Sequence, residues 1–179
     1  NGQGTYTSEN GNERKALWKG DEFLREESSL RQKQINTGDA LRAEVAKKRL
    51  LETKKCNECD FSRANFKQAK FNNVNLRGGW LEQCNLNEAK LSYSDLYEAK
   101  PSSLNLDEAC LNNANLSGAN WSVAYFLKTH LWESDLSGAN LKGADLHDAN
   151  LNSANLSNAN ISRAVLWNAN LSHANLSNS

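Results

Sequence analysis

From residue 61 to residue 176, a large apolar side chain returns at every fifth position. Leucine or phenylalanine fills nearly all of these central positions, with Trp121 and Ile161 as large substitutes and Pro101 as the exception. Two residues earlier the side chain is small in 22 of 24 repeats, and the residue between is Asn or Asp in 16 of 24. A register kept without a slip over this length predicts a repeat architecture.

A period of five fits neither a helix nor a straight strand. On a helix, five residues advance by about 500°, so the leucines would form no single face. On a straight strand, an odd period sends successive leucines to opposite faces. The chain must therefore turn a corner in every repeat, and four corners close a square coil of 20 residues. About six such coils stack at the strand spacing of about 4.8 Å.

The pattern thus predicts an all-β solenoid with a distinct role for each position of the repeat. We expect the leucines to fill the interior and the small residues to lie against the wall. We place Asn and Asp at the corners, because their side chains hydrogen-bond nearby backbone and mimic a turn. The two remaining residues face water, and backbone groups pair with the coils above and below.

The sequence A-N/D-L-x-x, as in 139–141 and 144–146, resembles the pentapeptide-repeat family over residues 56–179. The junction at 50–66 is similar to the start of the repeat array in cyanobacterial members. The resemblance implies a right-handed quadrilateral β-helix; the spacing argument itself indicates only the square coil.

Residues 1–55 lack the repeat, and we divide the chain into an N-terminal flexible segment with a helical cap, 1–55, and the β-helix, 56–179. Residues 1–12 are polar and rich in Gly and Asn, which favours disorder. Residues 13–35 mix charged and apolar side chains, and we expect a short helix within them.

A stronger helix pattern covers 39–55. Thr37 or Asp39 is a candidate N-cap, and Leu41, Val45 and Leu50 or Leu51 recur near helical spacing. Because the end of a coil stack exposes apolar side chains, we predict that this helix covers the first coil.

Composition excludes several classes of protein. With 21 basic and 21 acidic residues the net charge is zero, so the chain has no general attraction for nucleic acid or anionic membranes. No apolar run approaches the roughly 18 residues of a membrane span. The chain starts at Asn1 without a methionine, so we expect that an upstream segment has been removed. We favour a periplasmic or thylakoid-lumenal location and keep a cytoplasmic one as the alternative.

The pair Cys56 and Cys59 forms a CxxC motif. A zinc site needs four ligands, and no second CxxC supplies them. Cys84 falls at a small-residue position and Cys110 at an expected corner. We favour a structural Cys56–Cys59 pair, reduced or disulfide-bonded, over a redox or metal site.

Nothing in the sequence resembles a catalytic centre. His130, His147 and His173 fall at different positions of the repeat or in different coils, without a triad or a phosphate-binding glycine loop. A filled column also offers no pocket for convergent polar groups. We therefore expect no enzymatic activity and no cofactor.

Several large side chains occupy positions that should face outward. Leu127, His147 and Trp167 are twenty residues apart, so they stack in one column. Tyr125 and Val165 flank this column, and Trp132 lies one repeat away. Scattered apolar surface is ordinary, but several such groups on one face of a Ser/Asn surface form a candidate partner patch.

We therefore predict a non-enzymatic scaffold or interaction module that presents flat faces to an unidentified protein partner, without nucleic-acid binding or membrane insertion. The alternative is DNA mimicry, by which some family members bind topoisomerases such as gyrase. That function needs rows of carboxylates, whereas residues 59–179 carry 11 acids and 9 bases. We also expect an end-to-end homodimer through the C-terminal coil, because an open edge invites pairing. At Pro101 we expect a lost coil-to-coil bond, with Leu104 partly filling the space of the missing leucine.

Overall fold

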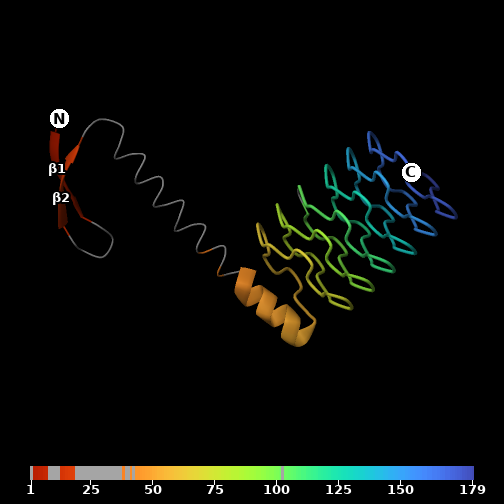
Figure 1. Cartoon of the computed structure of the whole chain (residues 1–179), viewed down its shortest axis with the longest axis horizontal. Coiled ribbons are helices and arrows are strands. Elements are labelled where there is room, and N and C mark those ends of the chain that lie inside the picture. Colours follow the sequence, from red (N-terminus) through yellow and green to blue (C-terminus); the bar gives the residue numbers. More distant parts are fainter. Residues whose placement is uncertain (1, 8–12, 19–37, 39–40, 42, 102) are drawn as a thin grey trace. The chain divides into compact units, whose positions relative to one another are not determined.

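A computed structural model describes residues 2–7, 13–18, 38, 41, 43–101 and 103–179 (Figure 1). The chain divides into two compact units, 1–39 and 40–179. No helix among these described residues is long and apolar enough to cross a bilayer.

The first unit contains a two-stranded antiparallel hairpin. Strand β1, Gly2–Thr7, pairs with β2, Glu13–Trp18, in a register that sets Gly2 opposite Trp18 and Thr7 opposite Glu13. The expectation of disorder over 1–12 is therefore wrong where β1 lies, and β2 occupies the first part of 13–35, within which we expected a short helix. Thr, Tyr and Trp favour strands, and Asn-Gly in the intervening sequence is a strong hairpin signal. The remainder of the expected short helix, 19–35, lies outside the described residues.

The second unit begins with a helix over 43–53, with residues 38 and 41 also helical. Its buried face agrees with our prediction at Leu50 but not at Leu41 or Val45. Ala43 and Leu50 are buried, whereas Leu41 and Val45 are 67% and 64% exposed. Small residues at 43 and 46 allow the helix backbone to approach the first coil closely, and only Leu50 extends into the core. Spacing alone did not reveal which face packs.

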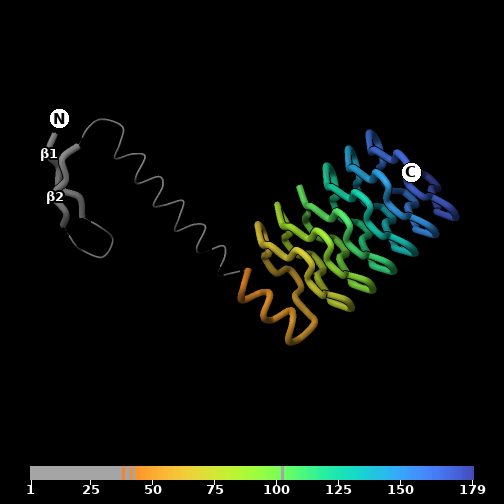
Figure 2. The backbone as a smooth tube through the Cα atoms, in the orientation of Figure 1, coloured from red at the N-terminus to blue at the C-terminus, as the bar shows by residue number. Residues whose placement is uncertain are grey.

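The rest of the second unit is a column of four-sided coils (Figure 2). Isolated parallel β-bridges join residues twenty apart, from Lys55–Asn75 to Asn155–Asn175. Backbone hydrogen bonds link successive coils, as in Phe61 N–H to the Trp80 carbonyl at 2.8 Å. Each coil therefore contains four five-residue repeats, as the period predicted.

The corners lie elsewhere than we placed them. In nearly every repeat the small residue donates to the preceding central carbonyl, as Ala64 N–H does to Phe61 at 2.9 Å, whereas the Val74 N–H donates to Ser94 Oγ instead. The second of the two enclosed residues has positive φ, such as 61° at Arg63. This is a type II turn at the two variable positions. Asn and Asp instead occupy the β-bridge, where their Oδ1 accepts the N–H two residues on, as Asp60 does from Ser62 at 3.0 Å.

The interior is filled by the central side chains. Phe61, Phe66 and Phe71 pack edge-to-face, with ring centroids 5.2 and 5.1 Å apart. Central residues from Leu106 to Leu156 are fully buried. In the last coil they are only partly buried, and Leu176 is 39% exposed. The column thus ends in apolar side chains that no further coil covers within the described residues.

The wall is interrupted at Pro101. Proline has no N–H to donate, and the bridges among the described residues do not include Lys100 with Asn120. Leu104 and Trp121 are fully buried here, and the Trp121 indole N–H donates to the Leu116 carbonyl at 3.0 Å. Leu104 therefore fills interior space beside the proline, as expected.

Candidate interaction surface

The outward side chains Tyr125, Leu127, His147, Val165 and Trp167 lie on the last three coils. Consecutive parallel bridges join Tyr125 to Asp145 and Asp145 to Val165, so these three stack along one wall. Tyr125, Val165 and Trp167 are 52%, 47% and 68% exposed, and Leu127 and His147 are half-buried. We call these five of the six predicted residues the strip.

His147 and Trp167 form the centre of the strip. Their ring centroids are 4.3 Å apart at 50°. His147 Nε2 lies 3.2 Å from Asp148 Oδ2, and Asn168 donates to the other oxygen of that carboxylate. The His147 backbone N–H is bound to Asp145 Oδ1 at 3.1 Å. These contacts fix the imidazole against one side of Trp167, whose remaining surface faces solvent.

Val123 is a further exposed apolar residue that sequence reasoning missed. It is 56% exposed and occupies the positive-φ position of the turn preceding Tyr125, with φ of 52°. This left-handed backbone conformation is strongly disfavoured for a β-branched residue. Among the described residues with positive φ, no other is β-branched. Its neighbour one coil on is Gly143, at the same turn position; correct placement of the corners would have identified Val123.

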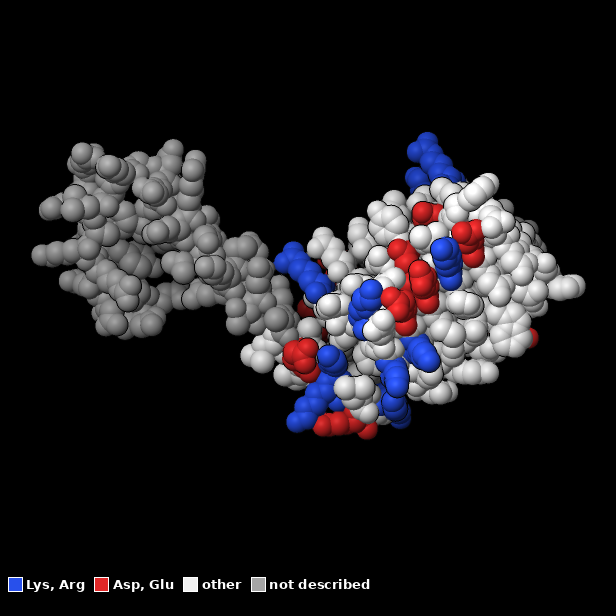
Figure 3. All heavy atoms as spheres, in the orientation of Figure 1, with Lys and Arg blue, Asp and Glu red and all other residues white. Residues whose placement is uncertain are grey.

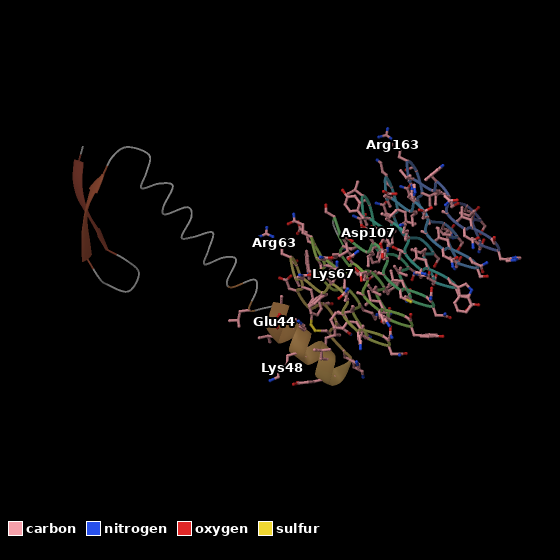
Figure 4. All side chains as sticks on the ribbon, viewed as in Figure 1. Glu44, Lys48, Arg63, Lys67, Asp107 and Arg163 are labelled. Atoms are coloured by element: carbon pink, nitrogen blue, oxygen red, sulfur yellow. A yellow bond between two sulfur atoms is a disulfide. The ribbon has the colours of Figure 1, made fainter. Side chains whose placement is uncertain are left out.

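Carboxylates lie beside and within the strip. Asp107 Oδ1 accepts the Leu127 N–H at 3.0 Å, and the Glu108 N–H binds the Leu127 carbonyl at 2.8 Å. With Asp145 and Asp148 they form an acidic rim. Burial raises the pKa of Asp107, and hydrogen bonds from Leu127 and a neighbouring Asn oppose this. Figure 4 shows Asp107 on the column wall and Arg163 at its edge.

Trp132 is separate from this group. It is 40% exposed at the next corner, where its N–H binds Asn112 Oδ1 at 3.1 Å. The ring contacts among the described residues join His147 to Trp167 and do not extend to Trp132. One whole wall, through His130, lies between its corner and that of Leu127.

Charge is uneven along the column. Figure 3 shows Lys, Arg, Asp and Glu gathered over the helix and first coils, while the C-terminal end is mostly uncharged on the face in view. Neighbouring charges of the first coils are of both signs. Lys67 pairs with Glu88 at 3.2 Å and Arg77 with Asp95 at 3.3 Å. Such mixed charge does not imitate a row of phosphates.

The cysteines occupy the positions of the repeat that the sequence indicated, except Cys110. Cys56, a central residue, is fully buried, and the structure joins it by a disulfide to Cys59, a small-position residue. Cys84 is buried, which raises its pKa to about 12. Cys110 lies in a β-bridge instead of at a corner, 3.1 Å from Ser92 Oγ.

The described histidines do not form a catalytic cluster, and the hollows of the surface lie apart from them. His130, His147 and His173 lie in different coils, and no group of His, Cys, Asp and Glu suited to a metal occurs among the described residues. The interior is filled, but hollows lie outside it among the described residues, contrary to the expectation of no pocket. One of about 400 Å³ lies between the helix and Cys59, and one of about 200 Å³ is lined by Arg77 and Tyr97 with neighbouring polar residues.

Four-sided coils, a type II turn in nearly every repeat and a leucine-filled interior define a repeat protein of the β-solenoid class. The family model for pentapeptide repeats matches residues 55–178 in overlapping segments. The chain therefore belongs to the pentapeptide-repeat family, whose architecture is the quadrilateral β-helix, and no catalytic family is indicated.

Solved structures of the same class are similar to this chain. The pentapeptide-repeat protein Rfr23 from the cyanobacterium Cyanothece 51142 is 25% identical, covering 71% of this chain and 93% of its own, with a TM-score of 0.46. A pentapeptide-repeat protein from the thylakoid lumen of Arabidopsis thaliana is 23% identical over 61% of this chain and 70% of its own, with a TM-score of 0.24. QnrB1, a plasmid-mediated fluoroquinolone resistance protein, is 17% identical, covering 67% of this chain and 64% of its own, with a TM-score of 0.28. No curated protein matches the chain.

Proposed function

We propose that this chain is a protein-interaction module and that its partner binds the strip together with Val123. The observation that carries the proposal is Val123 itself. Its side chain is exposed and contributes nothing to the core, yet its backbone adopts a conformation that costs a β-branched residue free energy. Strained residues of this kind cluster at functional sites.

The chemistry of the surface supports a protein partner. Exposed Tyr and Trp are the usual anchors of protein interfaces, because they bury large areas with few rotatable bonds. Here they project from a wall that is otherwise mostly Asn and Ser. His147 supports one side of the Trp167 ring, so binding does not have to order that side chain fully.

The rim defines the charge of the partner. Asp107, Glu108, Asp145 and Asp148 are the acidic residues of this surface, and Lys128 and Arg163, the latter in the column of Val123, are its basic residues on the last three coils. A partner with apolar side chains bordered by Lys or Arg complements this surface. Because rim charges act mainly on association rates, binding should weaken as salt rises.

The test is a paired measurement of folding and binding. Trp167→Ser with Tyr125→Ser should leave the melting temperature nearly unchanged, because both side chains are mostly exposed, and should abolish capture of the partner identified by affinity purification and mass spectrometry. Ser137→Lys with Ser157→Lys, half a coil away, is the control and should retain capture. Loss of stability with intact binding would show that the aromatic residues serve packing.

We also propose that the C-terminal coil associates with the same coil of a second copy. Its central residues Ile161, Leu166 and Leu171 are partly buried, whereas their equivalents one coil earlier are fully buried. Leu171→Lys with Leu176→Lys should convert dimers to monomers in analytical ultracentrifugation. A wild-type chain that remains monomeric at high concentration contradicts this arrangement.

The alternative, DNA mimicry directed at a topoisomerase, has less support. The acidic rim is interrupted by Lys128 and by neutral side chains, and no carboxylate row runs the length of a wall among the described residues. A gyrase supercoiling assay with the purified chain tests it directly, and we expect no inhibition.

A further inference from the structure

The Cys56–Cys59 disulfide lies where the helix meets the first coil. Cys56 and Cys59 are the ends of one type II turn, with the Cys59 N–H donating to the Cys56 carbonyl at 3.3 Å. The two sulfurs differ in access. Cys56 is fully buried, whereas Cys59 is partly exposed and lines the hollow of about 400 Å³ beside the helix.

The surroundings argue against a catalytic dithiol. Reactive CxxC cysteines have lowered pKa values at helix N-termini or beside positive charge, and the attacking sulfur is exposed. Here the motif follows the C-terminal end of the helix at 43–53, where the helix dipole disfavours a thiolate, and the nearby cation, Arg49, lines the hollow of Cys59 while Cys56 is buried. The first cysteine, Cys56, is also inaccessible. The pair is thus arranged as a substrate for thiol exchange instead of as its catalyst.

We propose that Cys59 is a redox modification site, at which an external dithiol reductant opens the disulfide and loosens the helical cap. A thiolate of the reductant attacks Cys59 Sγ, the sulfur–sulfur bond breaks, and the electron pair leaves on Cys56 Sγ, which takes a proton. The second thiol of the reductant, as a thiolate, then attacks the reductant's own sulfur in the mixed disulfide. Cys59 leaves as a thiolate beside Arg49, which lines the same hollow, and is protonated. The reductant becomes a disulfide and the protein gains two thiols.

Reduction acts on the helix because of how tightly Cys56 is packed. A disulfide holds two sulfurs about 2 Å apart, while two thiols require about 3.5 Å. Cys56 Sγ already lies 3.5 Å from the Ala46 carbonyl oxygen of the helix. Either Cys59 turns into the hollow between Leu41 and Val45, or Ala46 moves away. Both changes alter the packing of the helix on the first coil.

A turn of the same kind, one coil and one repeat further on, provides the contrast. Cys84 occupies the same small-residue position opposite Leu81, but it is fully buried, and burial raises its pKa to about 12. We therefore expect Cys84 to be unreactive in the folded protein. The reactivity of Cys59 follows from its position beside the helix and not from its place in the repeat.

The experiment compares two single-cysteine chains of full length. In a background of Cys84→Ala and Cys110→Asn, residue types found at those positions elsewhere in the array, either Cys56→Ser or Cys59→Ser leaves one thiol of the pair. The chain that retains Cys59 should react with N-ethylmaleimide at least about tenfold faster, because a buried thiol reacts only after local opening. Equal rates, or faster reaction of Cys56, would overturn the assignment.

Hydrogen exchange on the unmodified chain tests the effect on the cap without any substitution. After air oxidation, dithiothreitol should speed amide exchange over 43–53 severalfold and leave 131–160 unchanged. Unchanged amide exchange over the helix would refute the proposal that reduction loosens the helical cap. The proposal also fails if the isolated chain does not form the Cys56–Cys59 bond in oxidised glutathione. Neither result depends on the strip, so the interaction proposal stands or falls separately.

Discussion

Replacing Val123 by glycine should stabilise the protein, although it removes a large apolar side chain. Val123 has φ of 52° and is 56% exposed. The left-handed conformation costs an L-residue about 1–2 kcal/mol, and β-branching adds to this cost. The greater unfolded-state entropy of glycine opposes the gain by about 0.5–1 kcal/mol. The net stabilisation is about 1 kcal/mol, or about 2–4 °C in melting temperature for a chain of this size.

Gly143 provides the reverse experiment at the same position one coil on. Its φ is 67°, and a Cβ there would meet Val123 Cγ1 at 3.5 Å, an ordinary contact. Gly143→Ala should therefore destabilise the folded protein by about 1 kcal/mol, because alanine disfavours the left-handed backbone conformation at this position. Urea denaturation of both variants measures the two changes. A lower midpoint for Val123→Gly, or a higher one for Gly143→Ala, would refute the assignment of the turn and of its cost. If Val123→Gly stabilises and also weakens partner binding, the valine is present for binding.

Three further outcomes are expected. Inserting one residue between Ser153 and Ala154 should unfold the last coils, because it moves every later leucine off the interior, whereas inserting a whole 20-residue coil should be tolerated; thermal melts compare the two. Asp107→Asn should raise the urea midpoint of unfolding at pH 7. Because the pKa of Asp107 is raised in the folded state, its contribution to stability is present at low pH and is lost as the pH rises through the folded-state pKa. The stability difference between Asp107→Asn and the wild type should therefore disappear in acid. Leu81→Cys should form a disulfide with Cys84 when the chain is refolded under oxidising conditions, because this turn matches that of Cys56 and Cys59, whose Cα atoms are 5.4 Å apart; thiol titration should then find only Cys110 free.

The coil could be predicted from sequence because the interior is dictated by one periodic requirement. A large residue every fifth position and a small one two places earlier determine which side chains face inward, and the twenty-residue closure follows. The corners were misplaced because Asn and Asp have the composition of a turn, while the true corner positions hold Ser, Glu, Lys and Asn almost at random. One signal was available. Gly78, Gly118, Gly138 and Gly143 all occupy the second corner position, and all have positive φ.

The helix shows a different limit. Its sequence has apolar residues on more than one side, and periodicity cannot decide between a face with Leu41 and Val45 and one with Ala43 and Leu50. Close approach to the first coil selects the second face, since alanine allows backbone contact that larger side chains prevent. The exposed face that remains borders the hollow beside Cys59, so the choice of face also determines access to the disulfide.

Function in such a column has to be sought at the positions that the fold leaves free. An inward leucine or alanine is required by packing in every repeat and says nothing about a partner. Corner and bridge side chains tolerate many residue types, so the informative ones are those that folding disfavours. Val123 in a left-handed turn and Trp167 exposed to water both act against stability or solubility. They lie at successive corners of the same three coils, on either side of the wall that carries Tyr125 and Val165, and an interface across that wall would account for both.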